Sequence, residues 1–326
     1  MSHELTLNTV TNQIEFAYLE SDGAPWHGLG QPMQAGMTVE QWKRAAGMDW
    51  RIKRAKVRYP SSIDAQGNPL TYAEVPDKHV LFRNDTLAPL GVVSDKYKVV
   101  QPGEVLDFFR DIVRVGGLEL SAAGTIYGGA RFWATAKIGE ASPASLKDKI
   151  GGYLLLSTSA DGSLATEVRR TTIRTVCRNT LAMAMSDAPA SMKISHRSVF
   201  KPESVQEFMK LNHAAFDAFM HDLTELAHKD LKLEHAENLA VEIIGGEQDR
   251  VRASLGFNKV MELFTKTGLG AKEDGVYGTA WGLLNSFTEF SDHWARARSA
   301  ENRLVSSQWG PGNQLKQRAL EVLQGV

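Results

Sequence analysis

Basic side chains are concentrated in one stretch of the chain that contains few acids. Between Ala165 and Lys201 seven cations face only two acids, Glu167 and Asp187. The cations are Arg169, Arg170, Arg174, Arg178, Lys193, Arg197 and Lys201. Because positive side chains neutralise phosphates, this cluster predicts a surface that follows a nucleic-acid backbone. The alternative is a strand face that is simply exposed to solvent, and the sequence leaves both open.

A second basic cluster lies earlier in the chain. Arg51, Lys53, Arg54, Lys56 and Arg58 fall within eight residues that contain no acid. Charged and apolar residues alternate there, except at Arg54, and this period of two predicts a strand with one charged face. A local cluster of this kind can form a nucleic-acid footprint, so we expect Arg51, Lys53, Arg54 and Lys56 to contribute to binding.

Two aromatic residues follow Arg131 in the middle of a predicted strand. Neighbouring strand residues point to opposite faces, so one of Phe132 and Trp133 is expected in the core and the other on the second side of the sheet. A ring exposed beside Arg131 would stack on unpaired bases, and Trp133 is the candidate for this role. The alternative is that a helix layer covers each ring.

Other reactive residues form no recognisable catalytic or metal-binding motif. His213, His221, His228 and His235 are separated by eight, seven and seven residues, whereas a helical zinc pair is separated by four. Cys177, the single cysteine, lies in an apolar stretch that predicts burial. We therefore predict no catalytic residue, no metal site and no cofactor. An enzyme acting on nucleic acid or nucleotides through an unrecognised site remains an alternative.

Composition sets only broad limits on the 326-residue chain. Its net charge of −1 argues against a uniformly basic nucleic-acid-binding protein, but the charge is uneven. Residues 1–201 contain 24 cations and 20 acids, and residues 202–326 contain 13 cations and 18 acids. The sequence has no run of eighteen apolar residues and no secretory signal at its start, so no membrane association is expected. One cysteine excludes an internal disulfide and favours a cytoplasmic location.

The stretch from Gln101 to Ser186 predicts a helix, several strands and a second helix. Pro102 suits the first turn of the first helix, and Gly116 and Gly117 end it. Strands are expected over 118–127, 130–138, 152–159 and 163–175, the last two joined by a turn at Asp161-Gly162. Arg178 then enters the second helix, which would place the arginines at a sheet edge and a helix start. The order indicates an α+β fold with a helix–β–β–β–helix core and an antiparallel sheet.

Three parts are expected along the chain. An N-terminal arm over 1–50 contains one helix over 39–46, with Thr38 as its N-cap. An α+β core over 51–200 begins with two strands around a turn at 64–69, followed by short strands over 79–82 and 90–93. A mainly helical region follows over 201–326.

The C-terminal region shows helical periodicity almost throughout. Helices are expected over 205–229, 233–244, 249–265, 277–299 and 312–323. An apolar stripe runs along the fourth of these, and it either packs within the helical region or docks on a neighbouring subunit. Its residues are Trp281, Leu284, Phe287, Phe290 and Trp294.

Four segments of the chain resemble a phage- and plasmid-associated protein family of unknown function. They are residues 25–30 (PWHGLG), 91–101 (GVVSDKYKVVQ), 172–181 (TIRTVCRNTL) and 279–290 (TAWGLLNSFTEF), followed by Asp292 and His293. The resemblance spans nearly the whole chain. It implies occurrence in mobile elements and carries no established activity.

The order of elements over 101–186 also resembles the core of the single-strand annealing superfamily of recombination proteins. Residues 131–136 resemble its central strand, and residues 161–163 resemble its next hairpin turn. Members of that superfamily form rings or filaments that hold one DNA strand in an outer basic groove without covalent chemistry. The resemblance implies single-stranded DNA binding and annealing in recombination or replication, by a homo-oligomer. A protein-interaction module of a mobile element is a further alternative.

Overall fold

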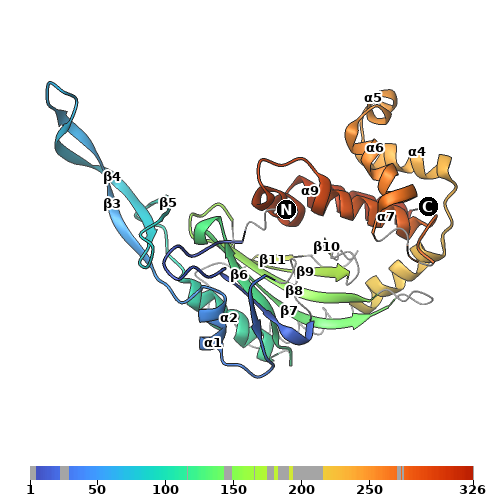
Figure 1. Ribbon diagram of the computed structural model, residues 1–326, viewed down its shortest axis with the longest axis horizontal. Coiled ribbons are helices and arrows are strands. Elements are labelled where there is room, and N and C mark those ends of the chain that lie inside the picture. The colour runs from blue at the N-terminus through green and yellow to red at the C-terminus, as the bar shows by residue number, and fades with distance from the viewer. Residues whose placement is uncertain are drawn as a thin grey trace.

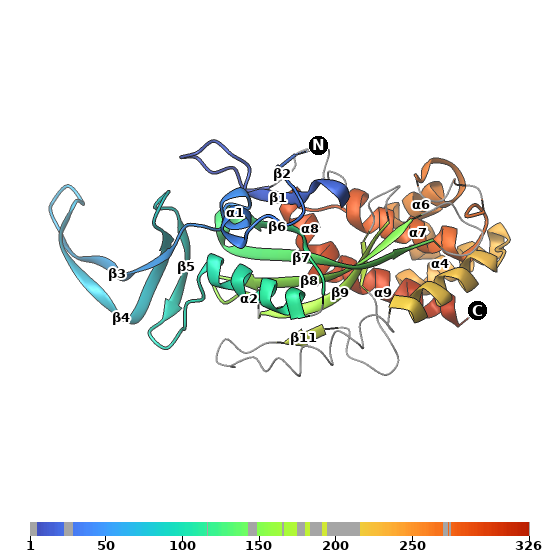
Figure 2. The same ribbon diagram turned by 90° about the horizontal axis from the view of Figure 1, so that it is seen from below.

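The structure is a computed structural model that describes residues 5–22, 29–115, 117–142, 149–164, 166–174, 180–182, 191–193, 216–269, 273 and 275–325. It contains a main β-sheet, a small sheet with a long projecting hairpin, and a helical region (Figure 1). The hairpin and the helical region lie at opposite ends of the molecule, with the main sheet between them (Figure 2). This mixed architecture confirms the predicted α+β fold class.

The main sheet has the strand order β10-β9-β8-β7-β6-β1-β2, and β11 also pairs with β9. Its neighbouring strands are antiparallel except β1 and β2, which are parallel. The strands are β1 (Phe16–Leu19), β2 (Gln31–Met33), β6 (Leu120–Ile126), β7 (Arg131–Ala141), β8 (Ile150–Ser159), β9 (Glu167–Arg174), β10 (Thr180–Ala182) and β11 (Ser191–Lys193). The expected four-strand meander is therefore present, and the N-terminal segment extends it through β1.

The prediction of a helix after β9 is wrong for the residues that the structure describes there. Thr180–Ala182 forms β10, which pairs with Thr171–Ile173 of β9. Apolar residues recur there at a spacing compatible with a helix, but the free edge of β9 offers backbone hydrogen-bonding groups that an added strand satisfies. As a result β9 lies inside the sheet, with β8 on one side and β10 and β11 on the other.

Both faces of the main sheet are covered. Helices α1 (Val39–Ala45) and α2 (Pro102–Val115) lie against one face, and α9 (Pro311–Gln324) lies over the other (Figure 1). Alternation along β7 sends Phe132 into the cluster that contains α1 and α2, and Trp133 into a second cluster with Leu155 on the opposite face. The prediction that these neighbours point to opposite faces is confirmed.

The two helices of the first face begin as expected. Thr38 caps α1, because its hydroxyl accepts a hydrogen bond from the Gln41 backbone while the Gln41 side chain accepts one from the Thr38 backbone. Pro102 opens α2, where it loses no intrahelical hydrogen bond.

The small sheet consists of β3 (Ile52–Ile63), β4 (Pro69–Arg83) and β5 (Pro89–Ser94) in that order. The two predicted strands around a turn at 64–69 are confirmed. Residues 79–82 are the end of β4 and not a separate strand, because β4 continues through an irregularity to pair with both neighbours.

The C-terminal region is helical, with more breaks than its periodicity predicts. A helix covers the described residues 216–228, followed by α4 (Leu233–Ile244), α5 (Gln248–Arg252), α6 (Leu255–Glu262), the π-helical turn η4 (Leu263–Thr267), α7 (Ala280–Glu289), the π-helical turn η5 (Phe290–Trp294), α8 (Ala300–Trp309) and α9. Ser254 divides the predicted helix over 249–265, because its hydroxyl caps α6. The helix expected over 277–299 is α7, started by the Thr279 cap, with η5 after it.

The apolar stripe of α7 packs mainly inside this region. Trp281, Leu284 and Phe287 are buried in the core that also contains α4 and α9. Trp294 lies at the end of η5, is exposed, and has the Lys259 ammonium 3.6 Å from its ring centre. Most of the stripe is thus used within the chain, which leaves little of it for a neighbouring subunit.

Candidate nucleic-acid interface

The hairpin arm, which we define as residues 57–77 of β3, β4 and their turn, extends beyond the third strand of the small sheet. β5 pairs with residues 78–82 of β4, and no third strand lies beside residues 57–77 in the described part of the chain. The register of β3 and β4 is irregular between Lys56 and Arg58, where the arm leaves the small sheet. The arm projects into solvent away from the main sheet (Figure 1).

A buried ionic network fixes the base of the arm to the main sheet. Arg83, at the end of β4, donates from Nη1 and Nη2 to the carboxylate of Glu15 at 3.0 and 2.5 Å. It also donates from Nε and Nη2 to Asp85 at 2.9 and 2.7 Å, and from Nη1 to the Gly128 carbonyl at 3.1 Å. Asn8 donates to both carboxylates at 3.0 Å.

Arg83 and Asp85 keep their charges within this network. Burial opposes the charge on Arg83, but hydrogen bonds and attraction from Asp85 and Glu15 outweigh it and raise the pKa of the guanidinium. Burial likewise opposes ionisation of Asp85, and the Arg83 contacts outweigh it and lower the pKa of that carboxyl. The Arg83 guanidinium also stacks on Trp50, 4.1 Å from the ring centre.

One glycine permits this stacking. Gly129 has a φ of +94°, and a Cβ atom there would lie 2.6 Å from the Trp50 ring and 2.9 Å from Arg83 Nη1. Only a glycine at position 129 therefore lets the turn between β6 and β7 approach the Trp50 ring so closely. The direction of the arm is set by packing that involves the main sheet itself.

Six exposed cations surround the base of the arm. Arg51 directly precedes β3, and Lys53 and Lys56 lie near its start. Lys78 belongs to β4, and Lys96 and Lys98 follow β5. Strand pairing brings them together, because Lys56 lies opposite His79 and Lys78 lies opposite Ser94. Within the described residues none of the six forms an ion pair, so their charges face solvent.

The other two cations of this cluster are already engaged. Arg54 donates to the backbone carbonyls of Ser94 and Asp95 at 3.2 and 3.4 Å. Arg58 Nη2 lies 3.0 Å from Glu74 Oε1 across the arm. Arg54 therefore links β3 to the end of β5 across β4, and Arg58 contributes little net charge to the surface.

The β9 arginines predicted to bind phosphate are placed differently. The side chain of Arg169 is 11% exposed, and its guanidinium pairs with Glu167 at 3.0 Å, donates to the Gln308 carbonyl and lies over the Trp309 ring. Arg170 is 2% exposed. Burial lowers the pKa of both guanidinium groups. The prediction that these arginines lie at an open sheet edge is wrong, because β10, β11 and α8 cover β9.

The predicted stacking ring is also covered. Trp133 is 5% exposed and stacks on Phe16 with ring centres 5.7 Å apart. Arg131 is half-buried, and its guanidinium lies over Tyr127 and within 3.3 Å of Ser163 Oγ. The layer above Trp133 includes Trp309, whose indole donates to Ser157 Oγ at 3.0 Å. Packing by residues near the end of the chain therefore removes Trp133 from the surface.

The remaining predicted contacts cannot be placed in this way. Arg178 and Arg197 lie outside the described residues. Arg174 and Lys193 belong to β9 and β11, but their side chains are not among those described. Cys177 and His213 also lie outside the described residues, whereas His221, His228 and His235 are exposed. No group of metal-ligating side chains occurs among the described residues.

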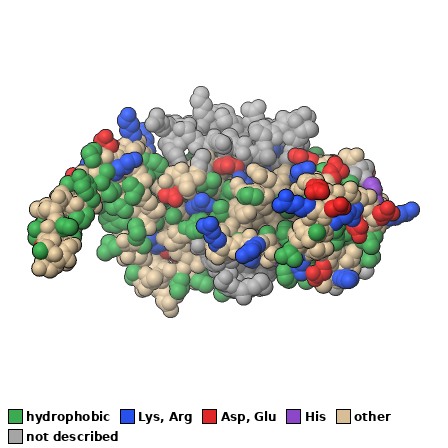
Figure 3. Space-filling view, turned by 90° about the horizontal axis from the view of Figure 1, so that it is seen from above, with side chains coloured by type: hydrophobic (Ala, Val, Ile, Leu, Met, Phe, Trp, Pro, Cys, Tyr) green, Lys and Arg blue, Asp and Glu red, His purple; other side chains and the backbone are tan. Residues whose placement is uncertain are grey.

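The arm displays large apolar side chains that the charge pattern does not predict. Tyr59 and Tyr72 are 51% and 60% exposed, and Ile63 and Leu70 near the turn are slightly more exposed. Figure 3 shows hydrophobic side chains along the arm, with Lys and Arg side chains where it meets the body. The large apolar residues within the two predicted strands were the signal in the sequence for this surface.

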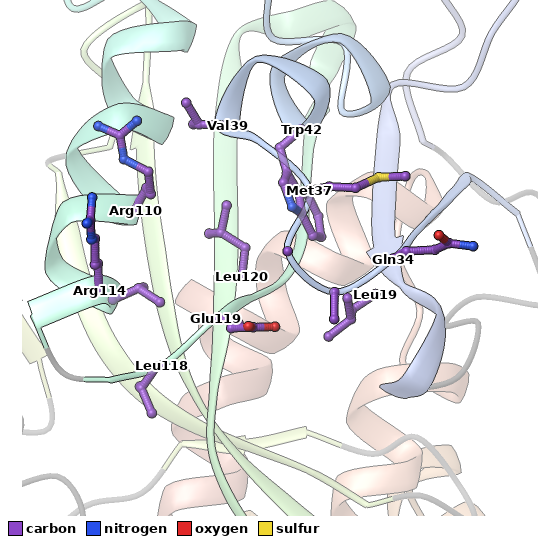
Figure 4. Close-up of a pocket in the computed structure, with 13 residues that line it drawn as sticks. Leu19, Gln34, Met37, Val39, Trp42, Arg110, Arg114, Leu118, Glu119 and Leu120 are labelled. Carbon is purple, nitrogen blue, oxygen red and sulfur yellow. The ribbon is translucent and has the colours of Figure 1, made fainter.

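A pocket of about 180 Å³ lies between α1, α2 and the main sheet. Leu19, Trp42 and Leu120 form part of its apolar wall, and Arg110 and Arg114 lie along α2 at its side (Figure 4). Arg110 pairs with Asp111 at 2.8 Å and lies 3.7 Å from Asp107. The lining residues that the structure describes contain no pair of a nucleophile and a base, so they indicate no particular reaction.

The sequence profile of a family described as a domain of unknown function, DUF932, matches residues 89–309. The chain belongs to this family. Neither a curated protein nor a solved structure matches the chain. The DUF932 match begins at β5 and ends at Trp309 of α8. It includes Lys96 and Lys98 but not β3 or β4, so the arm lies outside the matched residues. Among the described residues, no helix has the length and apolar character needed to cross a membrane.

Proposed function

We propose that this DUF932 protein binds single-stranded DNA on its small sheet and acts in strand annealing during recombination or replication. The observation that supports the proposal is the group of six exposed cations, Arg51, Lys53, Lys56, Lys78, Lys96 and Lys98, which surround the base of the arm without ion pairs among the described residues. Phosphate neutralisation by such side chains supplies most non-specific affinity for nucleic acid. The single cysteine and the resemblance to mobile-element proteins favour a cytoplasmic, phage or plasmid context.

The proposal makes a quantitative statement about salt. Each phosphate contact on a single strand contributes a slope of about 0.7 in a plot of log affinity against log salt. Six contacts would weaken binding roughly 300-fold for a fourfold rise in salt, and three contacts roughly 20-fold. The number of contacts can therefore be read from the slope, separately from the affinity itself.

The test replaces three of the lysines with glutamine in the full chain. K53Q/K56Q/K78Q should weaken binding to a labelled oligo-dT and lower the salt slope by about 2. The matched control is K232Q/R250Q/K266Q, which removes three exposed cations from the helical region and changes net charge equally. Fluorescence anisotropy at several salt concentrations measures both quantities. Equal slopes for the two triple variants and the parent would refute the assignment of this surface.

Annealing further requires that copies of the chain assemble. The proposal includes a homo-oligomer, a ring or a filament, because the main sheet ends at β2 and at β10 and β11, whose outer edges have no strand partner among the described residues. Sedimentation velocity with and without oligo-dT tests this part. A monomer at every concentration, with DNA present, would exclude the annealing role while leaving DNA binding open to the salt experiment.

A further inference from the structure

The middle of the hairpin arm has an unusual surface for a ribbon of two strands. Tyr59 and Tyr72 are each more than half exposed, and Ile63 and Leu70 lie further toward the turn. Two strands without a third partner or a covering helix are only marginally stable in water, and a group of exposed apolar side chains on them marks a candidate binding surface.

The two tyrosines lie next to each other on neighbouring strands and face opposite sides. Tyr59 is opposite Ala73, and Pro60 is opposite Tyr72, so the rings belong to adjacent cross-strand pairs. The partners of both rings, Ala73 and Pro60, are small. Each ring therefore presents an aromatic surface that no large side chain opposite it covers.

We propose that Tyr59 and Tyr72, one on each side of the arm, stack on unpaired bases of single-stranded DNA whose phosphates contact the lysines at the base of the arm. This inference rests on the proposed function and adds the residues that recognise bases. Aromatic side chains bind unpaired bases without sequence preference, because every base has a π-face.

Distance along the chain fits this arrangement. Tyr59 follows Lys56, the nearest of the six exposed cations on its strand, by three residues. A strand rises about 3.3 Å per residue, so the two backbone positions lie about 10 Å apart. That span corresponds to about three nucleotides at 3.4 Å per phosphate along a stacked strand. One segment of single-stranded DNA can therefore contact the lysines and a ring at once.

Charge along the arm limits where phosphates can lie. Residues 59–73 contain no Lys or Arg, and their one acid is Asp64 at the turn. Hydrogen bonds from the side chain and backbone of Asn68 lower the pKa of Asp64, which is therefore anionic at neutral pH. The six exposed cations thus lie below the arm, residues 59–73 are uncharged apart from Asp64, and Asp64 makes the turn acidic. A strand crossing it would keep its phosphates near the lysines and direct its bases toward the tyrosines.

The experiment separates stacking from general apolar contact. Y59L/Y72L keeps apolar side chains at both positions but removes the rings, and Y59F/Y72F keeps the rings and removes the hydroxyls. The probe is an oligo-dT that contains one 2-aminopurine, a base whose fluorescence falls when it stacks. We expect the Leu variant to bind about tenfold more weakly for each ring lost, with less quenching and an unchanged salt slope, and the Phe variant to match the parent.

Three other results would overturn the inference. Equal binding and quenching by the Leu variant and the parent, with a salt slope still present in the parent, would refute stacking but not DNA binding. No binding by the parent would refute both proposals. A Leu variant that binds like the parent, while I63S/L70S alone changes the sedimentation of the protein, would assign the arm to protein docking. Thermal melting of each variant confirms that folding is retained, which the exposure of all four positions favours.

Discussion

Loss of the Arg83 side chain should destabilise the protein far more than loss of an exposed arginine. R83M removes four charge-assisted hydrogen bonds to Glu15 and Asp85, and it leaves Glu15, which is 2% exposed, without its cation. Removing one partner of a buried ion pair costs about 3–5 kcal/mol, and loss of stacking on Trp50 adds about 1 kcal/mol. Since domains are stable by roughly 5–15 kcal/mol, R83M should lose a large part of the free energy of unfolding.

The matched control is R58M, which breaks the Arg58–Glu74 pair on the arm. Its side chains are 62% and 47% exposed, and exposed pairs of this kind contribute about 0–1 kcal/mol. Urea unfolding monitored by tryptophan fluorescence gives the midpoint and slope for each variant. A second variant, E15M/R83M, should recover part of the loss, because it no longer buries an uncompensated carboxylate.

The pH dependence of this effect has a definite sign. The folded-state pKa of Asp85 is depressed, so its contribution is present above the unfolded pKa and is lost as the pH falls through the folded value. The difference between the parent and R83M should therefore shrink in acid. Equal urea midpoints for R83M and R58M at neutral pH would refute the view that this network anchors the arm.

Three further predictions concern other buried polar groups. R169Q should lower the urea midpoint, since Arg169 contacts Glu167 and the α8 segment, and should leave the salt slope of oligo-dT binding unchanged. A reduced salt slope would show that Arg169 contacts DNA. K316M should destabilise by about 3 kcal/mol, because Lys316 lies in the core 2.8 Å from Asp292, and D292N/K316M should lose less in the same assay. Burial and the charge of Asp22 raise the pKa of Tyr153 to about 12, so its stabilising effect is complete below the unfolded pKa near 10 and is lost as the pH rises to about 12. Ultraviolet titration of folded Y153F should lack this late phenol, and an unchanged curve would contradict the assignment.

Local features of the sequence determined several elements well. Thr38 and Gln41 form a capping box within four residues, and the start of α1 follows from them. The turn at 64–69 is closed by Asp64, whose side chain accepts hydrogen bonds from the backbone of Gln66 and Asn68. These interactions join residues close in the sequence, so their residue types are sufficient to predict them.

Features that depend on distant segments were predicted less well. The sequence indicates strands over 118–175 but not that Thr180–Ala182 joins their edge, because a short apolar run suits a strand or a helix equally. Breaks in the C-terminal helices depend on single caps such as Ser254, which the overall periodicity obscures.

The candidate interface shows the same division between sequence and tertiary structure. The sequence by itself determined that the chain contains two basic clusters, that the cluster over 51–58 lies on a strand, and that Phe132 and Trp133 point to opposite faces. Only the tertiary structure decided which of these side chains reach solvent. Trp309, far along the chain, packs beside Trp133 and Arg169, whereas among the described residues no third strand pairs with residues 57–77. The physical reason is that charge and periodicity are local properties, while exposure depends on which distant segment buries its own apolar surface against the site.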